Sequence, residues 1–236
     1  MGAEMKTSLV YLFIFVAGCS LISGNAWATM YDFGDAVGYA QAYHSTPRWQ
    51  RLGDDWDAEN TQKLVDTSDD GVSWSVNGGT YGHENIVTGQ TVKFKFDIYK
   101  QEWGRHTSEQ LSVWLDWNQD LDFSDPGEDI FRTSWNFRSD YPASPYDDSF
   151  AGVSESFFFE LIVPDYALGD YWLRARVACN FDVSPLESFN PNGKVWQGEV
   201  EDWMLTVNPV PEPSTFLLLG GGLAGLAFYA RRRRKE

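Results

Sequence analysis

The chain has 236 residues, of which 43% are hydrophobic and 16% are aromatic. This apolar content is enough for one folded domain and excludes an intrinsically disordered chain. The 34 acidic residues outnumber the 18 basic ones, which gives a formal net charge of −16. Such a chain repels nucleic acids and anionic lipids and attracts cations such as calcium, so we expect no nucleic-acid partner.

Residues 1–28 have the features of a secretory signal peptide. Lys6 precedes an apolar run over residues 9–16, and Ala26 and Ala28 supply small side chains before a cleavage site. We therefore predict export through the Sec machinery and removal of this segment by signal peptidase. The alternative is a lipobox, because Cys19 follows Val-Ala-Gly and would then be lipidated.

Residues 29–209 are predicted to form one exported domain. The first 30 or so of these residues show little periodicity, so we expect a loop wrapped on the rest of the domain. Apolar and polar residues then alternate in five segments, 92–98, 111–117, 157–163, 173–179 and 203–207. A period of two is typical of half-buried strands, and turn residues separate the segments. The sequence thus predicts an all-β fold, an antiparallel, jelly-roll-like β-sandwich of about seven or eight strands.

The segment that starts at Asp116 carries the clearest chemical signal. Oxygen-bearing side chains occupy its alternate positions, namely Asp116, Asn118, Asp120 and Asp122. Calcium takes about six to eight oxygen ligands, and alternate residues of a loop can all turn toward one ion, so we predict a calcium loop. Leu121 stands where a glycine is usual, and no glutamate falls at the twelfth position, which excludes an EF-hand. The alternative is the solvent-facing side of a strand that leads into a turn.

Residues 210–236 form a second targeting segment. Pro211, Glu212 and Pro213 precede an apolar stretch over 215–230, and a basic cluster follows, Arg231, Arg232, Arg233 and Arg234. We predict one transmembrane helix over 215–230 with the basic cluster in the cytoplasm.

This order of motif, apolar stretch and basic cluster resembles the PEP-CTERM sorting signal of Gram-negative bacteria. The resemblance implies recognition by an exosortase and an intermediate held in the inner membrane with its domain in the periplasm. It also implies delivery to the cell surface or extracellular matrix, in association with exopolysaccharide and biofilm. A plain membrane anchor is the alternative.

Residues 198–202, Gly-Glu-Val-Glu-Asp, lead into the last predicted strand. Further segments stand in a matching order, at 31–36, 57–59, 70–72, 114–120 and 163–164. The chain therefore resembles a GEVED domain, from which it departs at Leu121 and Trp203. The resemblance implies a secreted or surface-attached bacterial protein and no generally established activity. From the strand pattern we expect Glu199 and Glu201 to pair with Arg174 and Arg176 of the preceding strand or to bind metal.

No catalytic set emerges from the sequence. The three histidines, His44, His83 and His106, lack ligand spacing, and no serine stands in a nucleophile-elbow context. We therefore predict a protein that is not an enzyme. A polysaccharide-active enzyme is the alternative, because among so many carboxylates some pair will fall at a suitable separation.

Five tryptophans are predicted to lie in or near loops, Trp49, Trp56, Trp103, Trp135 and Trp196. Exposed indole rings stack on sugar rings, so these residues are candidate glycan contacts and make a carbohydrate-binding module an alternative function. The other interpretation is that they close the ends of the sandwich. Together the patterns predict a non-catalytic surface or matrix protein with structural calcium, and a homotypic adhesin is a third possibility.

Overall fold

The structure is a computed structural model that describes residues 31–46, 49–56, 59, 61, 68–101, 108–136, 152–211 and 215–233. Its first strands are β1 (Asp32–Phe33), β2 (Ala42–His44), β3 (Gln50–Leu52), β4 (Val72–Val76), β5 (Ile86–Val87) and β6 (Thr91–Lys100). The later strands are β7 (Glu109–Leu115), β8 (Asp129–Trp135), β9 (Val153–Ile162), β10 (Gly169–Cys179), β11 (Gly193–Val195) and β12 (Gly198–Asn208). A 3-10 turn, η2 (Leu186–Ser188), and a helix, α2 (Thr215–Arg233), complete the described elements. The predicted signal peptide lies outside the described residues.

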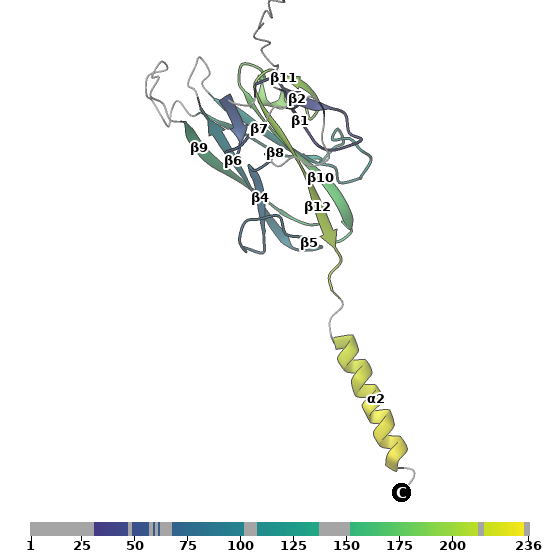
Figure 1. Cartoon of the computed structure of the whole chain (residues 1–236). Coiled ribbons are helices and arrows are strands. Elements are labelled where there is room, and N and C mark those ends of the chain that lie inside the picture. Colours follow the sequence, from purple (N-terminus) through teal and green to yellow (C-terminus); the bar gives the residue numbers. More distant parts are fainter. Residues whose placement is uncertain are drawn as a thin grey trace, which may run out of the picture.

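Two packed sheets confirm the predicted β-sandwich (Figure 1). The first has the order β5-β12-β10-β7-β8, and the second has β6 between β9 on one side and β3 and β4 on the other. A strand covers most or all of each of the five segments predicted from the alternation, although β7 ends at Leu115 and β9 at Ile162. The pairings of these strands are antiparallel except that β12 pairs with β5 in parallel.

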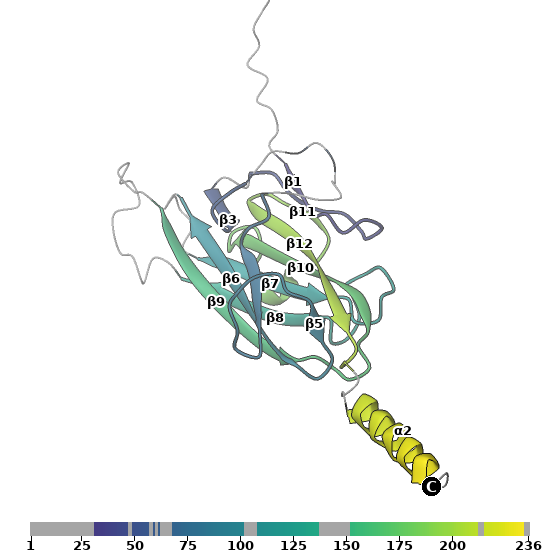
Figure 2. The ribbon, with the colours of Figure 1, turned by 60° about the horizontal axis from the view of Figure 1, so that its bottom comes forward.

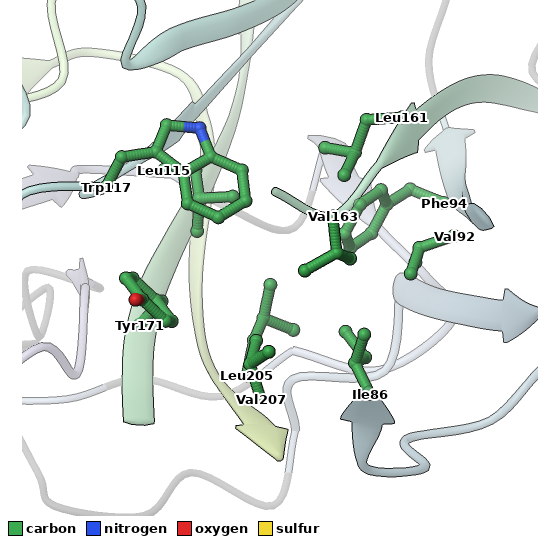
Figure 3. A pocket seen from close by; sticks show the side chains of 10 residues that line it. All are labelled: Ile86, Val92, Phe94, Leu115, Trp117, Leu161, Val163, Tyr171, Leu205 and Val207. Carbon is green, nitrogen blue, oxygen red and sulfur yellow. The ribbon is translucent and has the colours of Figure 1, made fainter. Parts of the chain in front are cut away.

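The alternation explains which side chains fill the space between the sheets. In β6, Phe94 and Phe96 are buried, whereas Lys93 and Lys95, which alternate with them, are partly exposed. The inner faces leave a space of only about 10 Å³, which is about the room that one water molecule needs (Figure 3). Ten side chains line it: Ile86, Val92, Phe94, Leu115, Trp117, Leu161, Val163, Tyr171, Leu205 and Val207. The interior is therefore a packed core and offers no room for a ligand.

A third, small sheet with the order β1-β2-β11 corrects the prediction of a plain loop after residue 29. It lies at one end of the sandwich, beside the start of β12 (Figures 1 and 2). A second apolar cluster lies between this region and the outer side of β7 and β10, and it includes Tyr39, Trp114, Phe123, Ala178 and Phe189. Strands of two or three residues are too short to show a period, which is why the sequence did not reveal them.

The C-terminal segment also requires a correction. A helix is present, as predicted, but no helix in the described part of the chain is long and apolar enough to cross a membrane. The last three residues of α2 are arginines, and glycines interrupt its apolar stretch at 220–222 and 225. The predicted transmembrane helix over 215–230 is therefore not supported.

Candidate functional site

Asp116 organises the loop that follows β7. This carboxylate is fully buried, and its Oδ1 accepts a hydrogen bond of 2.7 Å from the backbone N–H of Gln119. Its Oδ2 accepts hydrogen bonds from the backbone N–H of Leu121 at 3.2 Å and from the hydroxyl of Tyr39 at 2.5 Å. Gln119 and Leu121 have φ angles of 60° and 74°, so the backbone curls around the carboxylate. Burial, followed by the hydrogen bond to Asp116, raises the pKa of Tyr39, which keeps this hydroxyl a donor.

Three carboxylates come together at this loop, those of Asp116, Asp120 and Glu128. One oxygen from each lies within 4.8 Å of the others. Glu128 is 2% exposed, and its Oε2 accepts a hydrogen bond of 3.0 Å from the backbone N–H of Asp125. Its Oε1 is buried and has no hydrogen-bond partner among the described residues. Burial, with the nearby charges of Asp116 and Asp120, raises the pKa of Glu128 to about 7. A cation at this point would supply the missing partner and offset the repulsion.

The structure brings together two of the four predicted ligands, Asp116 and Asp120, and adds Glu128 to them. Asn118 is exposed, and its Nδ2 donates hydrogen bonds to Asp120 and Asp125 at 3.1 and 2.5 Å. Asp122 is not a member of the carboxylate group, and its Oδ1 accepts a hydrogen bond of 2.7 Å from the N–H of Ser124. Sequence reasoning did not assign Glu128 as a ligand. The Asp-Pro-Gly turn before it was the available signal, because the N–H of Glu128 bonds back to the carbonyl of Asp125 at 3.1 Å.

The five candidate tryptophans lie in different environments. Trp196 is 58% exposed, whereas Trp49 and Trp56 are half-buried. Trp135 ends β8 and is only 3% exposed within the core, so the prediction that it is an exposed ring in or near a loop is wrong. Trp103 lies outside the described residues. Trp196 is thus the only one of the four described candidates that offers an open ring face.

The two glutamates of the 198–202 segment point between the sheets. Glu199 Oε2 accepts a hydrogen bond of 2.6 Å from the N–H of Leu52. Glu201 accepts hydrogen bonds from the N–H groups of Gly71 and Val72 at 2.7 and 3.0 Å, and from the indole of Trp203 at 2.9 Å. The two carboxylates therefore accept hydrogen bonds from backbone N–H groups at the end of β3 and the start of β4. No neighbouring strand that the structure describes pairs with these N–H groups.

The expected pairing of these glutamates with Arg174 and Arg176 is wrong. In the register of β10 and β12, Arg174 lies opposite Asp202 and Arg176 lies opposite Val200. Side chains alternate along a strand, so both glutamates point to the other face of the sheet. Arg174 instead forms two hydrogen bonds with Asp202, at 2.7 and 2.8 Å, and both side chains are buried. Asp202 also accepts a hydrogen bond of 2.8 Å from the N–H of Ala36.

The sorting segment is described in part. Pro211 is exposed, and Arg231, Arg232 and Arg233 form the exposed end of α2. Glu212, Pro213 and Arg234 lie outside the described residues.

Comparison with solved structures shows only distant likeness. The chain is 15% identical to the C-terminal domain of wzt, with a TM-score of 0.32, covering 58% of this chain and 70% of that one. It is 10% identical to a CARDB domain from Pyrococcus furiosus in complex with di-metal ions, with a TM-score of 0.31, covering 64% of this chain and all of that one. At these scores the likeness has no bearing on function. No curated protein matches the chain.

Two family models match the sequence. Residues 110–206 match the GEVED domain, and residues 209–234 match the PEP-CTERM protein-sorting motif. The first range runs from β7 to β12 and includes the carboxylate group and the 198–202 segment, and the second includes α2. The PEP-CTERM motif is the signal that an exosortase recognises, and it implies export and sorting to the cell surface. The chain is thus a GEVED domain protein with a C-terminal PEP-CTERM protein-sorting motif.

Proposed function

We propose that this protein is a non-catalytic module of the cell surface or extracellular matrix of a Gram-negative bacterium, stabilised by calcium and associated with exopolysaccharide in biofilm. Its sorting motif supports delivery to the surface. The calcium part rests on two observations: one carboxylate oxygen each of Asp116, Asp120 and Glu128 lie within 4.8 Å of one another, and the buried Oε1 of Glu128 has no hydrogen-bond partner among the described residues.

Calcium suits this site better than a softer metal. All three groups offer carboxylate oxygens, and no histidine or cysteine belongs to the cluster among the described residues. Hard cations prefer such ligands, and exposed Asp120 leaves room for water molecules to complete the coordination. An ion bound to the folded state alone raises the free energy of unfolding by mass action. This stabilisation matters for the domain, because Cys179 is a buried thiol and no disulfide links the described residues.

The surroundings of the described histidines support a non-catalytic role. His44 is fully buried, and burial lowers its pKa well below the usual value. His83 Nε2 donates a hydrogen bond of 2.8 Å to the carbonyl oxygen of Val72, and its ring stacks on Trp203 with 3.9 Å between ring centroids. Both side chains are thus engaged in packing. The matching test is incubation with bacterial exopolysaccharide, from which we expect no release of reducing ends.

Thermal unfolding of the full-length protein tests the calcium site. We expect the melting temperature in millimolar calcium to exceed that in EDTA by several degrees, because a ligand in about hundredfold excess over Kd adds about 3 kcal/mol. Glu128→Gln and Asp120→Asn should each abolish this difference.

Two control variants sharpen the test. Asp122→Asn should retain the calcium response if the group of Asp116, Asp120 and Glu128 is the site, and Glu84→Gln, which is remote in sequence, should retain it as well. Coincident curves for the unmodified protein in calcium and EDTA would contradict the proposal. Loss of the response in Asp122→Asn alone would move the site to the other end of the loop.

A further inference from the structure

The small sheet of β1, β2 and β11 carries aromatic side chains on its outward face. Phe33 lies opposite Tyr43 in the register of β1 and β2, and Tyr43 lies opposite Lys194 in the register of β2 and β11. Tyr31 precedes Phe33 by two residues and Trp196 follows Lys194 by two, so the alternation of side chains places both on this face although they flank β1 and β11. The alternate residues, Asp32, Ala42 and His44, are buried on the other side. We call the five outward side chains, Tyr31, Phe33, Tyr43, Lys194 and Trp196, the aromatic platform.

The rings of the platform lie against one another. The ring centroids of Phe33 and Tyr43 are 5.2 Å apart and their planes differ by 24°, which is a stacked pair. Tyr31 is 5.8 Å from Phe33 and 5.7 Å from Tyr43. The three rings are half-buried, whereas Trp196 is 58% exposed. The outward face of the sheet thus carries a row of aromatic rings that pack against one another, and the exposed indole of Trp196 lies at the end of this row.

A lysine joins the rings of the platform. Lys194 Nζ lies 5.5 Å from the ring centroid of Tyr31 and 5.1 Å from that of Trp196. It forms no ion pair with any described carboxylate, although the chain has 34 acidic residues. An exposed ammonium between two ring faces is free to bind an anionic group of a ligand that stacks on them.

A polar cavity of about 150 Å³ lies beside β11 and adds a second positive charge. Arg176, Lys194, Asp182, Ser188, Asn190 and Asn192 contribute to its lining. Arg176 is fully buried and donates to the carbonyls of Asn190, Asn192 and Gly193 and to His44, but no described carboxylate forms an ion pair with it. Burial lowers the pKa of Arg176 to about 9, so the guanidinium stays charged at neutral pH. In a region of low dielectric constant, the guanidinium charge attracts an anion more strongly than it would in water.

We propose that the aromatic platform and the adjoining cavity bind an acidic polysaccharide, with a sugar ring stacked on Trp196 and its carboxylate held by Lys194. This inference rests on the proposed association with exopolysaccharide and gives it a place on the molecule. Sugar rings have apolar C–H faces that pack on aromatic rings, and the hydroxyl and amide groups of Ser188, Asn190 and Asn192 suit sugar hydroxyls.

The charge of the whole chain favours a carboxylated sugar over the other anionic polymers. With a net charge of −16, the protein repels nucleic acids and anionic membranes over long distances, and two local cations do not offset that repulsion. A polysaccharide with one carboxylate per sugar ring has a lower charge density and offers the ring faces that the platform needs. An acidic peptide lacks such flat apolar faces and would not depend on Trp196 in the same way.

Calorimetric titration of the full-length protein tests the proposal. The probes are oligogalacturonate, which is acidic, and a malto-oligosaccharide, which is neutral, both in EDTA so that calcium bridging is removed. We expect binding of oligogalacturonate and at least about tenfold weaker binding of the neutral sugar. Trp196→Ala and Lys194→Glu should each raise the Kd for oligogalacturonate about tenfold or more.

Two control variants match these changes elsewhere on the surface. Tyr166→Ala removes an aromatic ring that is 77% exposed, and Lys93→Glu makes the same charge change next to Phe158, whose ring lies 4.7 Å from Lys93 Nζ. Both should leave the Kd within about twofold, the scatter expected of surface changes away from the site. All four variants should melt at similar temperatures, because their side chains lie at the surface.

Several outcomes would overturn the inference. No binding of oligogalacturonate, equal binding of both sugars, or equal weakening by Lys93→Glu and Lys194→Glu would each do so. Binding that needs calcium and is lost in Asp120→Asn would place the sugar at the carboxylate group instead. A protein that gains stability from calcium yet binds no oligogalacturonate would refute only this inference, whereas absent calcium stabilisation would refute only the proposed calcium site.

Discussion

Leu121 adopts a backbone conformation that is unusual for its side chain. Its φ angle of 74° lies in the left-handed region, which costs an L-residue other than glycine, asparagine or aspartate about 1–2 kcal/mol. The conformation is imposed by Asp116, whose Oδ2 accepts the hydrogen bond from the N–H of Leu121 at 3.2 Å. This is the position at which the sequence led us to expect a glycine, and the geometry supplies the physical reason for that expectation.

Replacing Leu121 with glycine should therefore stabilise the protein, although a change from leucine to glycine usually destabilises a protein. Relief of the strain outweighs the added chain entropy of glycine in the unfolded state, which is about 0.5–1 kcal/mol. We expect Leu121→Gly to raise the free energy of unfolding in urea by up to about 1 kcal/mol. The matched control is Leu168→Gly, because Leu168 is 49% exposed, close to the 53% of Leu121, but has no positive φ. Destabilisation by both changes would show that the loop carries no strain.

The start of β12 is the element that joins the N-terminal strands to the sandwich. Its inner face receives the N–H groups of Leu52, Gly71 and Val72 through Glu199 and Glu201. On the outer face, the N–H of Val200 donates to Asp32 at 2.7 Å. Gly198 has a φ of 117°, and a Cβ there would lie 1.8 Å from the carbonyl oxygen of Val177, so only glycine fits. Residues 198–202 thus connect the N-terminal strands to the sandwich.

Removal of one partner from the buried pair of Arg174 and Asp202 should destabilise the domain strongly. Asp202→Ala leaves the guanidinium buried without its counter-charge, which typically costs about 3–5 kcal/mol. Glu160→Ala, on the exposed face of β9, should change the free energy of unfolding by less than about 0.5 kcal/mol. Chemical denaturation measures both. The double variant Arg174→Met with Asp202→Leu should recover much of the loss, and a single variant as stable as the double one would contradict the assignment.

Longer strands were predictable from the sequence because their alternation continues over many residues. Phe157, Phe159 and Leu161 mark β9, and Leu173, Ala175 and Val177 mark β10. The small sheet was not predictable, because β1 and β2 have two and three residues and their pairing with β11 joins distant parts of the chain. The aromatic platform was not predictable for the same reason. Asp116 and Asp120 could be found from their spacing, whereas Tyr43 and Lys194 meet only through the fold.

At the scale of the whole molecule, several carboxylates are buried in a chain that is already acidic. Burial raises the pKa of Glu201 to about 7, and burial with the charges of Asp32 and Glu201 raises the pKa of Glu199 well above its usual value. The ordinary pKa of a glutamate in the unfolded chain is about 4.5. At pH values between about 4.5 and 7, these glutamates are still protonated in the folded protein but have lost their protons in the unfolded chain.

The free energy of unfolding should therefore fall as the pH rises from about 4.5 to 7 and then level off. We expect urea denaturation in EDTA to give a value at pH 8 that is roughly 1–3 kcal/mol below that at pH 5. Self-repulsion of the net negative charge acts in the same direction. Glu201→Gln should flatten part of the slope, because this side chain no longer titrates. Stability that rises over this range would contradict the raised pKa values.

The direction of β12 has a mechanical consequence. Trp196 lies two residues before β12 begins, and Pro211 of the sorting motif lies three residues after it ends. Eleven strand residues separate the two ends by about 33 Å, and Figure 1 shows β12 running from the small sheet down the length of the domain. A pull between a partner held at the platform and an attachment at the C-terminus would act along this strand. Because Trp196 and Pro211 flank β12 in the same chain, the covalent backbone of this extended strand would carry the load, and the hydrogen bonds to β10 would not have to break.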